Sequence, residues 1–397
     1  MAWAGLRSIS RRTFSTAADR RHYFPSDFPT ADFTLVGQEE LLRFCSDCLL
    51  SSGAKPKHAD CVARVLVEAD LRAVYSHGIN RLKMYADECR TGAVDVEAEP
   101  VVERERAGTA VVSGRNALGA VCGEFSMSLA IEKAKTHGIG WVLARNSNHY
   151  GIAGHYAMMA LDHGLIGMSM TNTSPLVVPT RAKNPALGTN PIALAAPTSG
   201  RDPFVLDMAT SAVALGKVEV AHRRGDKLPL GWSVGPSGLP TDDAEAAVHS
   251  SVTGKGGLMP LGGLEENGGY KGYGLAMLVE VLGGVLADSS FGREVRTWQS
   301  PLLEGEGADE GANLGQTFVA IDPDFFMPGF PQRMDRFVDQ MRGLPSAEGQ
   351  PAVMVPGEPE LNARREQSEH GIRLHDSLVE SLHRLAEECG VPRAGLL

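Results

Sequence analysis

Two short stretches of the sequence hold the residue types best suited to catalysis. The first, YSHGINRLKMY, places His77, Arg81 and Tyr85 at intervals of four residues. If a helix begins after the glycine, these side chains share one helical face. An arginine fork can then hold a carboxylate while the imidazole exchanges a proton with a neighbouring hydroxyl or carbonyl oxygen. The spacing fits a 2-hydroxy or 2-oxo acid; a helix-capping Ser76 and His77 with a surface Arg81 is the structural alternative.

The second stretch, NSNHYGIAGHYA at 146–157, contains two histidines around two glycines. It follows the strand-like WVLAR, and polar turns at the carboxyl ends of strands are where α/β proteins bind ligands. His149 falls in this turn and is predicted to contact a ligand, whereas His155 falls in the following helix and is predicted to be structural. A metal site that uses both histidines is the competing interpretation, although no third ligand stands at a suitable spacing.

Two further charged residues stand beside predicted helix starts. Asp207 follows an apolar strand and precedes a helix start expected at 210–211, so it is either a ligand contact or a helix cap. Lys271 lies in GGYKGYG, just before a helix predicted over 272–287, where backbone N–H groups and a cation suit a phosphate or another anion. The chain lacks the P-loop spacing and contains no G-x-G-x-x-G, so its patterns do not indicate a Rossmann fold.

The elements that must position these residues change character along the chain. Helical patterns dominate the N-terminal part, and short strand-like runs alternating with helices begin at Thr109, which predicts an α/β layer architecture. The segment from 220 to 271 is rich in Gly, Pro, Asp and Ser, which predicts long loops over a ligand. We expect a helical domain from residues 30–108 and 325–397 and an α/β domain from 109–324. A ligand would bind between them.

Composition limits the class of partner. The net charge is −10 and the pI is near 5.7, which argues against binding nucleic acid. The most apolar stretch, GLAMLVEVLGGVLA, is too short to cross a bilayer and contains Glu280. Cys45 and Cys48 form a C-x-x-C, but they follow the apolar face of a helix and are predicted to be core residues. We therefore expect a small-molecule partner and neither nucleic acid nor membrane.

The first 24 residues differ from the rest. They contain Arg7, Arg11 and Arg12, several hydroxyl residues and no acid before Asp19, a composition typical of a mitochondrial transit peptide. Residues 1–24 are therefore predicted to be a presequence removed near Phe14 and Ser15, with the mature protein in the mitochondrial matrix. A basic tail on a cytoplasmic protein is the alternative.

Seven segments together resemble the type-2 malate/L-lactate dehydrogenase family over about residues 36–390. The family includes ureidoglycolate and sulfolactate dehydrogenases and 2,3-diketogulonate reductase. The resemblance implies an NAD(P)-dependent oxidoreductase, usually a homodimer, whose nucleotide site is not a Rossmann fold. It further implies a mixed-sheet α/β sandwich beside a smaller helical domain. The segments, in order, are DLRAVYSHGINRLKMY, ARNSNHYGIAGHYA, PALGTNPIALAAP, VLDMATSAVALGK, LPLGWSVGPSG, MPLGGLEENGGYKGYGLAMLVEVLGGVL and VPGEPE.

The resemblance also assigns residues to roles. It implies that His77 of the S-H-G motif is the acid/base, a role given to the equivalent of His149 in some members, and that Arg81 binds the substrate carboxylate. We add the neighbouring Ser76 to the catalytic group and Tyr85 to the substrate contacts. The implied cofactor contacts are Thr171, Asn172, Thr173, Asn190, Asp207, Met208, Ala209, Thr210, Tyr270, Lys271, Gly272, Pro356, Gly357 and Glu358.

One segment departs from the family pattern. Members often have two glycines after the proline of VVP, whereas this chain has Thr180, Arg181 and Ala182, so no cofactor contact is assigned there.

We predict reversible hydride transfer between nicotinamide and a small 2-oxo acid, with NAD or NADP as cofactor. Three alternatives are kept. The same scaffold could reduce a cyclic imino acid, or a metal-dependent hydrolase could use His149 and His155. The chain could also be an inactive relative that only binds nucleotide. The sequence chooses neither the substrate nor between the two cofactors.

Overall fold

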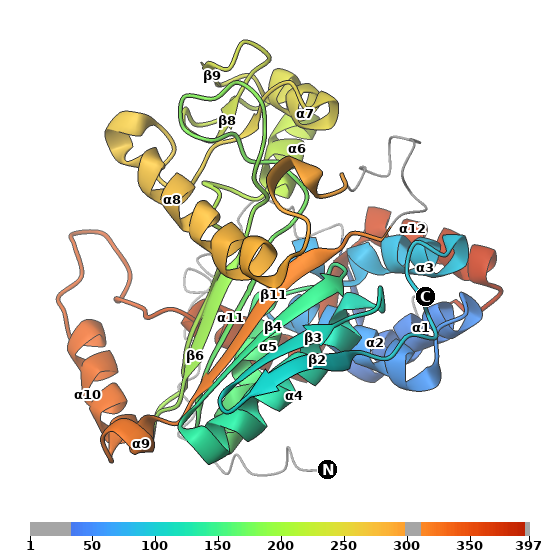
Figure 1. The fold of residues 1–397 in the computed structure, drawn as a ribbon. Helices are drawn as coiled ribbons and strands as arrows, with labels where there is room; N and C mark the ends of the chain where they lie inside the picture. Colours follow the sequence, from blue (N-terminus) through green and yellow to red (C-terminus); the bar gives the residue numbers. More distant parts are fainter. Residues whose placement is uncertain (1–32, 298–310, 394–397) are drawn as a thin grey trace.

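A seven-stranded mixed sheet forms the centre of the computed structural model, which describes residues 33–297 and 311–393 (Figure 1). Its strand order is β2-β3-β4-β11-β5-β6-β7, and only the β3 and β4 pair is parallel. The mixed α/β fold predicted from the sequence is therefore confirmed. The strands are β2 (Val101–Arg106), β3 (Thr109–Ser113), β4 (Ile139–Ser147), β5 (Ile166–Thr171), β6 (Ile192–Ala196), β7 (Phe204–Met208) and β11 (Leu314–Ile321).

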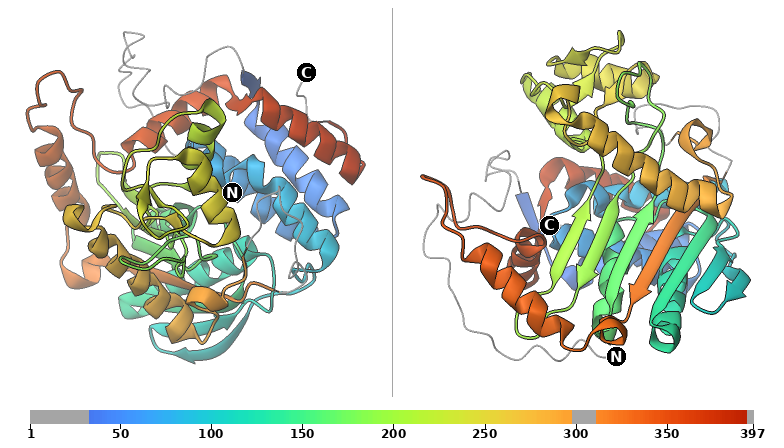
Figure 2. Two further views of the ribbon diagram at one scale, coloured as in Figure 1. Left: turned by 90° about the horizontal axis from the view of Figure 1, so that it is seen from above. Right: turned by 60° about the vertical axis from the view of Figure 1, so that its left-hand side comes forward.

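Helices cover one face of this sheet, and a further helix crosses one end of its other face (Figure 2). On the covered face, α4 (Gly119–His137) and α5 (Ala153–Met159) pack on alternate strand residues such as Val142 and Phe318. At the end of the other face, α8 (Gly269–Glu280) continues into a π-helix (Val281–Val285), whose Leu282 carbonyl accepts a hydrogen bond from Thr317 Oγ1 at 2.8 Å. The helix approaches β11 so closely that a Cβ on Gly283 would lie 2.7 Å from the Gly315 oxygen.

A helical layer lies beside the sheet and combines both ends of the described chain. Its core joins Leu41, Phe44 and Leu66 to Leu382 and Leu385. Buried Cys45 and Cys48 belong to the same core, which confirms their prediction as core residues. The layer contains α1 (Gln38–Ser51), α2 (Pro56–Leu71), α3 (Leu82–Thr91), α11 (Glu358–His370) and α12 (Asp376–Cys389), with β1 (Phe33–Val36) paired antiparallel to β12 (Ile372–His375).

A small lobe occupies the segment predicted to be long loops, so that prediction is wrong. It contains α6 (Leu215–Arg224), α7 (Ala244–Thr253) and a three-stranded sheet of β8 (Ser233–Val234), β9 (Pro240–Thr241) and β10 (Gly257–Leu258). Helix α7 forms because Asp243 caps it by accepting from Ala246 N–H, and because its small residues Ala244 and Ala247 are buried.

An arm projects from the end of the sheet opposite α8 (orange in Figure 2). It consists of α9 (Pro323–Phe326) and α10 (Phe330–Arg342), and Asp335 accepts hydrogen bonds from the backbone of Ser199 and Gly200. Among the described residues, no helix combines the length and apolar character needed to cross a membrane. The predicted presequence at 1–24 lies outside the described residues.

Candidate active site

Two histidines from different layers meet in the structure. His149 lies in the turn between β4 and α5, as predicted, and His77 ends a short 3₁₀ turn (Tyr75–His77) between α2 and α3. Their imidazole rings stack with centroids 5.6 Å apart and planes inclined by 17°. The fold therefore brings together the two motifs that the sequence singled out for chemistry.

The helix that the sequence places after Gly78 is present, but His77 lies before it, so His77, Arg81 and Tyr85 do not share one helical face. Gly78 is extended, with φ −87° and ψ −149°, and it separates two 3₁₀ turns, the second of which (Ile79–Arg81) leads into α3. The residues converge nonetheless. Arg81 Nε donates to the Ser76 carbonyl at 2.8 Å, and the Tyr85 hydroxyl lies 2.6 Å from His149 Nδ1.

Asp70 explains why the helix breaks at Gly78. Its buried carboxylate accepts the Ile79 N–H at 2.7 Å, and a Cβ on Gly78 would lie 1.9 Å from Asp70 Oδ1. Burial raises the pKa of Asp70 to about 7, while the bond from Ile79 acts in the opposite direction. Sequence reasoning missed this residue. The feature of the sequence that could have indicated Asp70 is an acidic residue in an apolar helical stretch shortly before the S-H-G motif.

Hydrogen bonds fix both imidazoles at Nδ1. Ser76 Oγ lies 2.8 Å from His77 Nδ1. At His149, the Gly151 N–H donates to Nδ1 at 3.4 Å, so this nitrogen is an acceptor and the Tyr85 hydroxyl is the stronger donor to it. The neutral His149 ring assigned from this network therefore carries its proton on Nε2.

The surroundings keep both rings neutral in the ligand-free protein. Burial lowers the pKa of His77 to about 4, with a smaller contribution from the Arg81 charge. Burial, His77 and Arg81 together lower the pKa of His149 well below its usual value. Protein crowds both rings, yet neither is fully shielded from solvent. A carboxylate bound to Arg81 would offset the cation and make either ring easier to protonate.

The predicted cofactor segments after β5, before β6 and after β7 are joined by hydrogen bonds. Asn190 Oδ1 accepts from Thr173 N–H at 3.1 Å, and the Asn190 carbonyl accepts from Thr210 Oγ1 at 3.0 Å. Thr171 ends β5, while Met208 ends β7 and Ala209 follows it. These segments are therefore held together by hydrogen bonds at one end of the sheet, where Thr171, Asn190 and Thr210 are buried.

The remaining predicted cofactor segments lie at the start of α8 and beside β7. Helix α8 is joined to the segment after β7 through Leu261, whose N–H donates to the Thr210 carbonyl at 2.8 Å and whose carbonyl oxygen lies 2.3 Å from a Cβ placed on Gly272. The exposed Tyr270 and Lys271 stand in the first turn of α8. Beside β7, the Pro356 carbonyl accepts a hydrogen bond from Val205 N–H at 3.3 Å. The next residue, Gly357, has a φ of +93°. The Glu358 carboxylate accepts a hydrogen bond from Val355 N–H.

Two of the predicted contacts have their amide groups engaged inside the protein. Asn172 Nδ2 donates to Glu280 Oε2 at 3.0 Å and to the Ser290 carbonyl at 2.8 Å. Asn190 Nδ2 donates to Glu280 Oε1 at 2.9 Å and to the Ala276 carbonyl at 3.1 Å. Both residues are completely buried, and their backbone carbonyl oxygens accept hydrogen bonds from the hydroxyl groups of Thr171 and Thr210. Glu280, an acid within an apolar helix, was not predicted as a site residue.

Asp207 does not cap the helix that follows it, because α6 begins only at Leu215. Its Oδ2 accepts the Gly154 N–H at 2.8 Å instead, which ties β7 to the start of α5 and to the His149 turn. Crowding by protein raises the pKa of Asp207 to about 6, opposed by the Gly154 N–H and the Arg72 charge. The residue nevertheless remains exposed to solvent.

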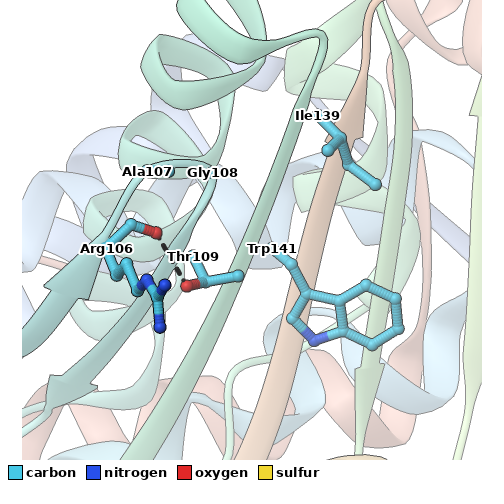
Figure 3. Close-up of a pocket in the computed structure, with 6 residues that line it drawn as sticks. All are labelled: Arg106, Ala107, Gly108, Thr109, Ile139 and Trp141. Carbon is cyan, nitrogen blue, oxygen red and sulfur yellow. Dashed lines mark hydrogen bonds between the residues drawn. The ribbon is translucent and has the colours of Figure 1, made fainter.

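The structure gives no support to a metal site that uses His149 and His155. His155 Nε2 lies 3.6 Å from Glu124, which also binds Arg64, whereas His149 contacts His77 and Tyr85. Within residues 33–297 and 311–393, no three His, Cys, Asp or Glu side chains are arranged to hold a metal ion. A shallow depression lined by Arg106, Ala107, Gly108, Thr109, Ile139 and Trp141 lies at the opposite end of β4 from the histidines (Figure 3).

Comparison with known proteins identifies the family. The malate/L-lactate dehydrogenase family profile matches residues 36–383. The chain belongs to this family. It is 39% identical to a malate dehydrogenase of Pyrococcus horikoshii over 371 residues, which cover 93% of this chain and 99% of that protein.

Two further relatives extend the comparison. The solved structure of malate dehydrogenase from Entamoeba histolytica superposes with a TM-score of 0.84 at 32% identity, covering 91% of this chain and 99% of that one. A Δ1-pyrroline-2-carboxylate reductase of Ancylobacter novellus is 32% identical over 342 residues, which cover 86% of this chain and 94% of that protein. The predicted family, its fold and an oxidoreductase of the dehydrogenase class are confirmed, and the relatives named above are dehydrogenases and a reductase, not hydrolases.

Proposed function

We propose that this member of the malate/L-lactate dehydrogenase family transfers a hydride between a nicotinamide cofactor and C2 of a small 2-hydroxy or 2-oxo acid. The observation that carries the proposal is the stacked pair of His77 and His149 beside Arg81, with each imidazole fixed at Nδ1. Such a site offers a cation for a carboxylate and two imidazoles for the oxygen on the adjacent carbon.

Arg81 would anchor the substrate. Its Nε is engaged by the Ser76 carbonyl, which aims the guanidinium, and the two terminal nitrogens are the donors suited to a carboxylate. Holding the substrate in this way fixes the distance between its reacting carbon and the histidines.

The two histidines would have different roles at the substrate oxygen. His149 presents its Nε2–H to that oxygen and polarises the carbonyl. His77, whose Nδ1 contacts Ser76, exchanges the proton through Nε2, giving it to the oxygen during reduction and removing it during oxidation. A bound nicotinamide cofactor supplies or accepts the hydride.

The residues present fit a dinucleotide. Lys271 is exposed in the first turn of α8, where its ammonium group and the positive end of the helix dipole favour an anion such as a diphosphate. Gly188 lets the loop before β6 pack closely on the segment after β5, since a Cβ there would lie 2.1 Å from Thr173 Oγ1. Asp207 holds the Gly154 N–H through Oδ2 and could offer its other carboxylate oxygen, Oδ1, to a hydroxyl group.

The substrate is proposed to be a malate-like or lactate-like acid. The substrates in the names of two relatives, the malate dehydrogenase and the Δ1-pyrroline-2-carboxylate reductase, share a reactive carbon next to a carboxylate. In malate this carbon carries a hydroxyl group, which oxidation converts to C=O, and in Δ1-pyrroline-2-carboxylate it forms a C=N bond. Arg81 and the histidine pair suit both, so reduction of a cyclic imino acid is the second candidate.

The experiment is a reductase assay on protein beginning at Ser15. Loss of NADH or NADPH absorbance is followed with oxaloacetate, pyruvate, 2-oxoglutarate, sulfopyruvate, diketogulonate and cyclic imino acids. Turnover of a 2-oxo acid supports the proposal, and turnover of imino acids alone moves it to the second candidate. Absence of both turnover and nucleotide binding overturns it.

We further propose that the protein is a homodimer in which a second copy covers the outer face of α8 and the π-helix. Large apolar side chains are exposed along this face, which crosses the ends of the central strands (Figure 2), and contiguous apolar patches mark association surfaces. Light scattering should give the dimer mass for the wild type and the monomer mass for a variant with Met277→Lys and Val281→Lys. The exposed residues are Leu275, Met277, Leu278, Val281, Val285 and Leu286.

The N-terminal residues are proposed to direct the protein to the mitochondrial matrix. The support is the composition of residues 1–24, with its arginines and hydroxyl residues and the absence of early acids. A reporter fused to residues 1–24 should enter mitochondria and be cleaved near Phe14, whereas a version with Arg7, Arg11 and Arg12 replaced by Glu should stay in the cytosol. Cytosolic retention of both would contradict the proposal.

A further inference from the structure

A short segment, Ser290–Arg296, is attached at both ends to the loop that follows β5. The Ser290 carbonyl accepts from Asn172 Nδ2 at 2.8 Å, and the Arg296 carbonyl accepts from Ser174 Oγ at 2.7 Å. Between these points, the Gly292 N–H donates to Glu280 at 3.3 Å. The segment is therefore anchored to the predicted cofactor loop at 172–174.

The same segment reaches across to the helical layer. The Arg296 guanidinium forms an ion pair with Glu88 on α3, and only 14% and 9% of the two side chains are exposed. Glu88 lies one turn beyond Tyr85 on that helix, and its charge contributes to raising the pKa of the Tyr85 hydroxyl, after burial. Tyr85 in turn holds His149 at Nδ1.

A continuous path of contacts thus runs from the cofactor loop to the catalytic histidines. It passes from Ser174 to Arg296, then to Glu88, along α3 to Tyr85, and finally to His149. Helix α3 also begins directly after Arg81, so any displacement of this helix moves the proposed carboxylate anchor as well.

We propose that Arg296 is a positioning residue, which holds α3 against the cofactor loop through Glu88 so that Tyr85 and Arg81 keep the geometry that reaction requires. This inference rests on the proposed function, because it concerns the same site. It adds a link between nucleotide binding and substrate positioning that the motifs themselves do not contain.

Variants of this ion pair can distinguish a contribution to stability from a contribution to the position of α3. Removing one partner of a buried pair leaves an uncompensated charge and destabilises the protein, whereas replacing both by apolar residues of similar volume is often neutral. A double variant with Glu88→Met and Arg296→Met should therefore regain stability that either single variant loses. It cannot regain the directional contact that orients α3.

The test compares both single variants, the double variant and wild type by urea unfolding, NADH binding and steady-state kinetics. The double variant should recover stability and bind NADH, yet keep a kcat roughly 10- to 100-fold below wild type with a raised KM for the carboxylate substrate. Recovery of kcat and KM together with stability would overturn the proposal, because the pair would then be only structural. Lys133→Met is the matched control, since Lys133 is buried and binds Glu105 far from the histidines; it should lose stability while keeping its kinetics.

Two milder variants keep the proposal testable if the double variant does not fold. Ser174→Ala removes the hydrogen bond to the Arg296 carbonyl, and Arg296→Lys keeps the charge but not the planar fork. Both should lower kcat by several-fold at an unchanged denaturation midpoint, and wild-type kinetics in both would overturn the proposal. Wild-type protein with neither NAD(P)H turnover nor nucleotide binding would overturn the proposed function instead, so the two failures are distinguishable.

Discussion

The imidazoles of His77 and His149 stack with their centroids 5.6 Å apart, although they come from different layers of the fold. Two cationic rings at this distance beside Arg81 would repel one another strongly, so the site admits one added proton at most. This relationship suits a reaction that moves a single proton together with a hydride.

The first prediction separates the roles of the two histidines. His77→Gln should lower kcat by about 10²- to 10⁴-fold in both directions, because the proton donor and acceptor is lost. His149→Gln should cost less, since the amide of glutamine can still donate a hydrogen bond to the substrate oxygen. Steady-state kinetics on variants with wild-type circular dichroism provide the measurement, and near-normal turnover of His77→Gln would contradict the acid/base assignment.

The second prediction concerns Arg81 and pH. The Arg81 charge helps to hold the pKa of His77 at about 4 in the ligand-free protein, so Arg81→Met should raise that pKa. The rate constant kcat/KM for oxidation needs neutral His77 and rises with pH through this pKa, so its acidic limb should move to higher pH. KM for the carboxylate should increase as well. An unmoved limb with an unchanged KM would place Arg81 outside the site.

The third prediction tests the tautomer of His149. Tyr85→Phe removes the hydroxyl that donates to His149 Nδ1 at 2.6 Å and leaves only the longer bond from Gly151. The ring can then adopt the other tautomer, so kcat should fall roughly tenfold while NADH affinity is unchanged. If Tyr85 instead contacts the substrate directly, KM will change more than kcat. Steady-state kinetics of Tyr85→Phe, which give both constants, therefore distinguish the two roles.

Local sequence patterns were sufficient for five of the seven strands of the central sheet and for the His149 turn, but not for β2 and β6. Alternating apolar runs predicted β3, β4, β5, β7 and β11, and the polar residues after WVLAR marked where β4 ends. These features depend on residues close together in the chain, which is why the pattern is informative.

Tertiary contacts determined what the patterns missed. The break at Gly78 depends on the Asp70 carboxylate from the preceding helix, and the engagement of Asn172 and Asn190 depends on Glu280 far along the chain. A buried acid that accepts hydrogen bonds from distant segments leaves no periodic signal. Only its presence in an otherwise apolar helix is visible in the sequence.

The last prediction concerns Asp70 and the pH dependence of stability. Its pKa is raised from 3.8 to about 7 in the folded protein, so the folded state retains a proton that the unfolded chain releases. This contribution to stability is complete below pH 3.8 and is lost as the pH rises through about 7, with a total on the order of 4 kcal/mol. Asp70→Asn cannot titrate, and its oxygen can still accept the Ile79 N–H. The unfolding free energies of wild type and variant are measured by urea denaturation. Between pH 4 and pH 7 the wild type should lose stability relative to the variant, and above pH 7 the difference should stay constant. A difference that does not change with pH would mean that Asp70 titrates normally.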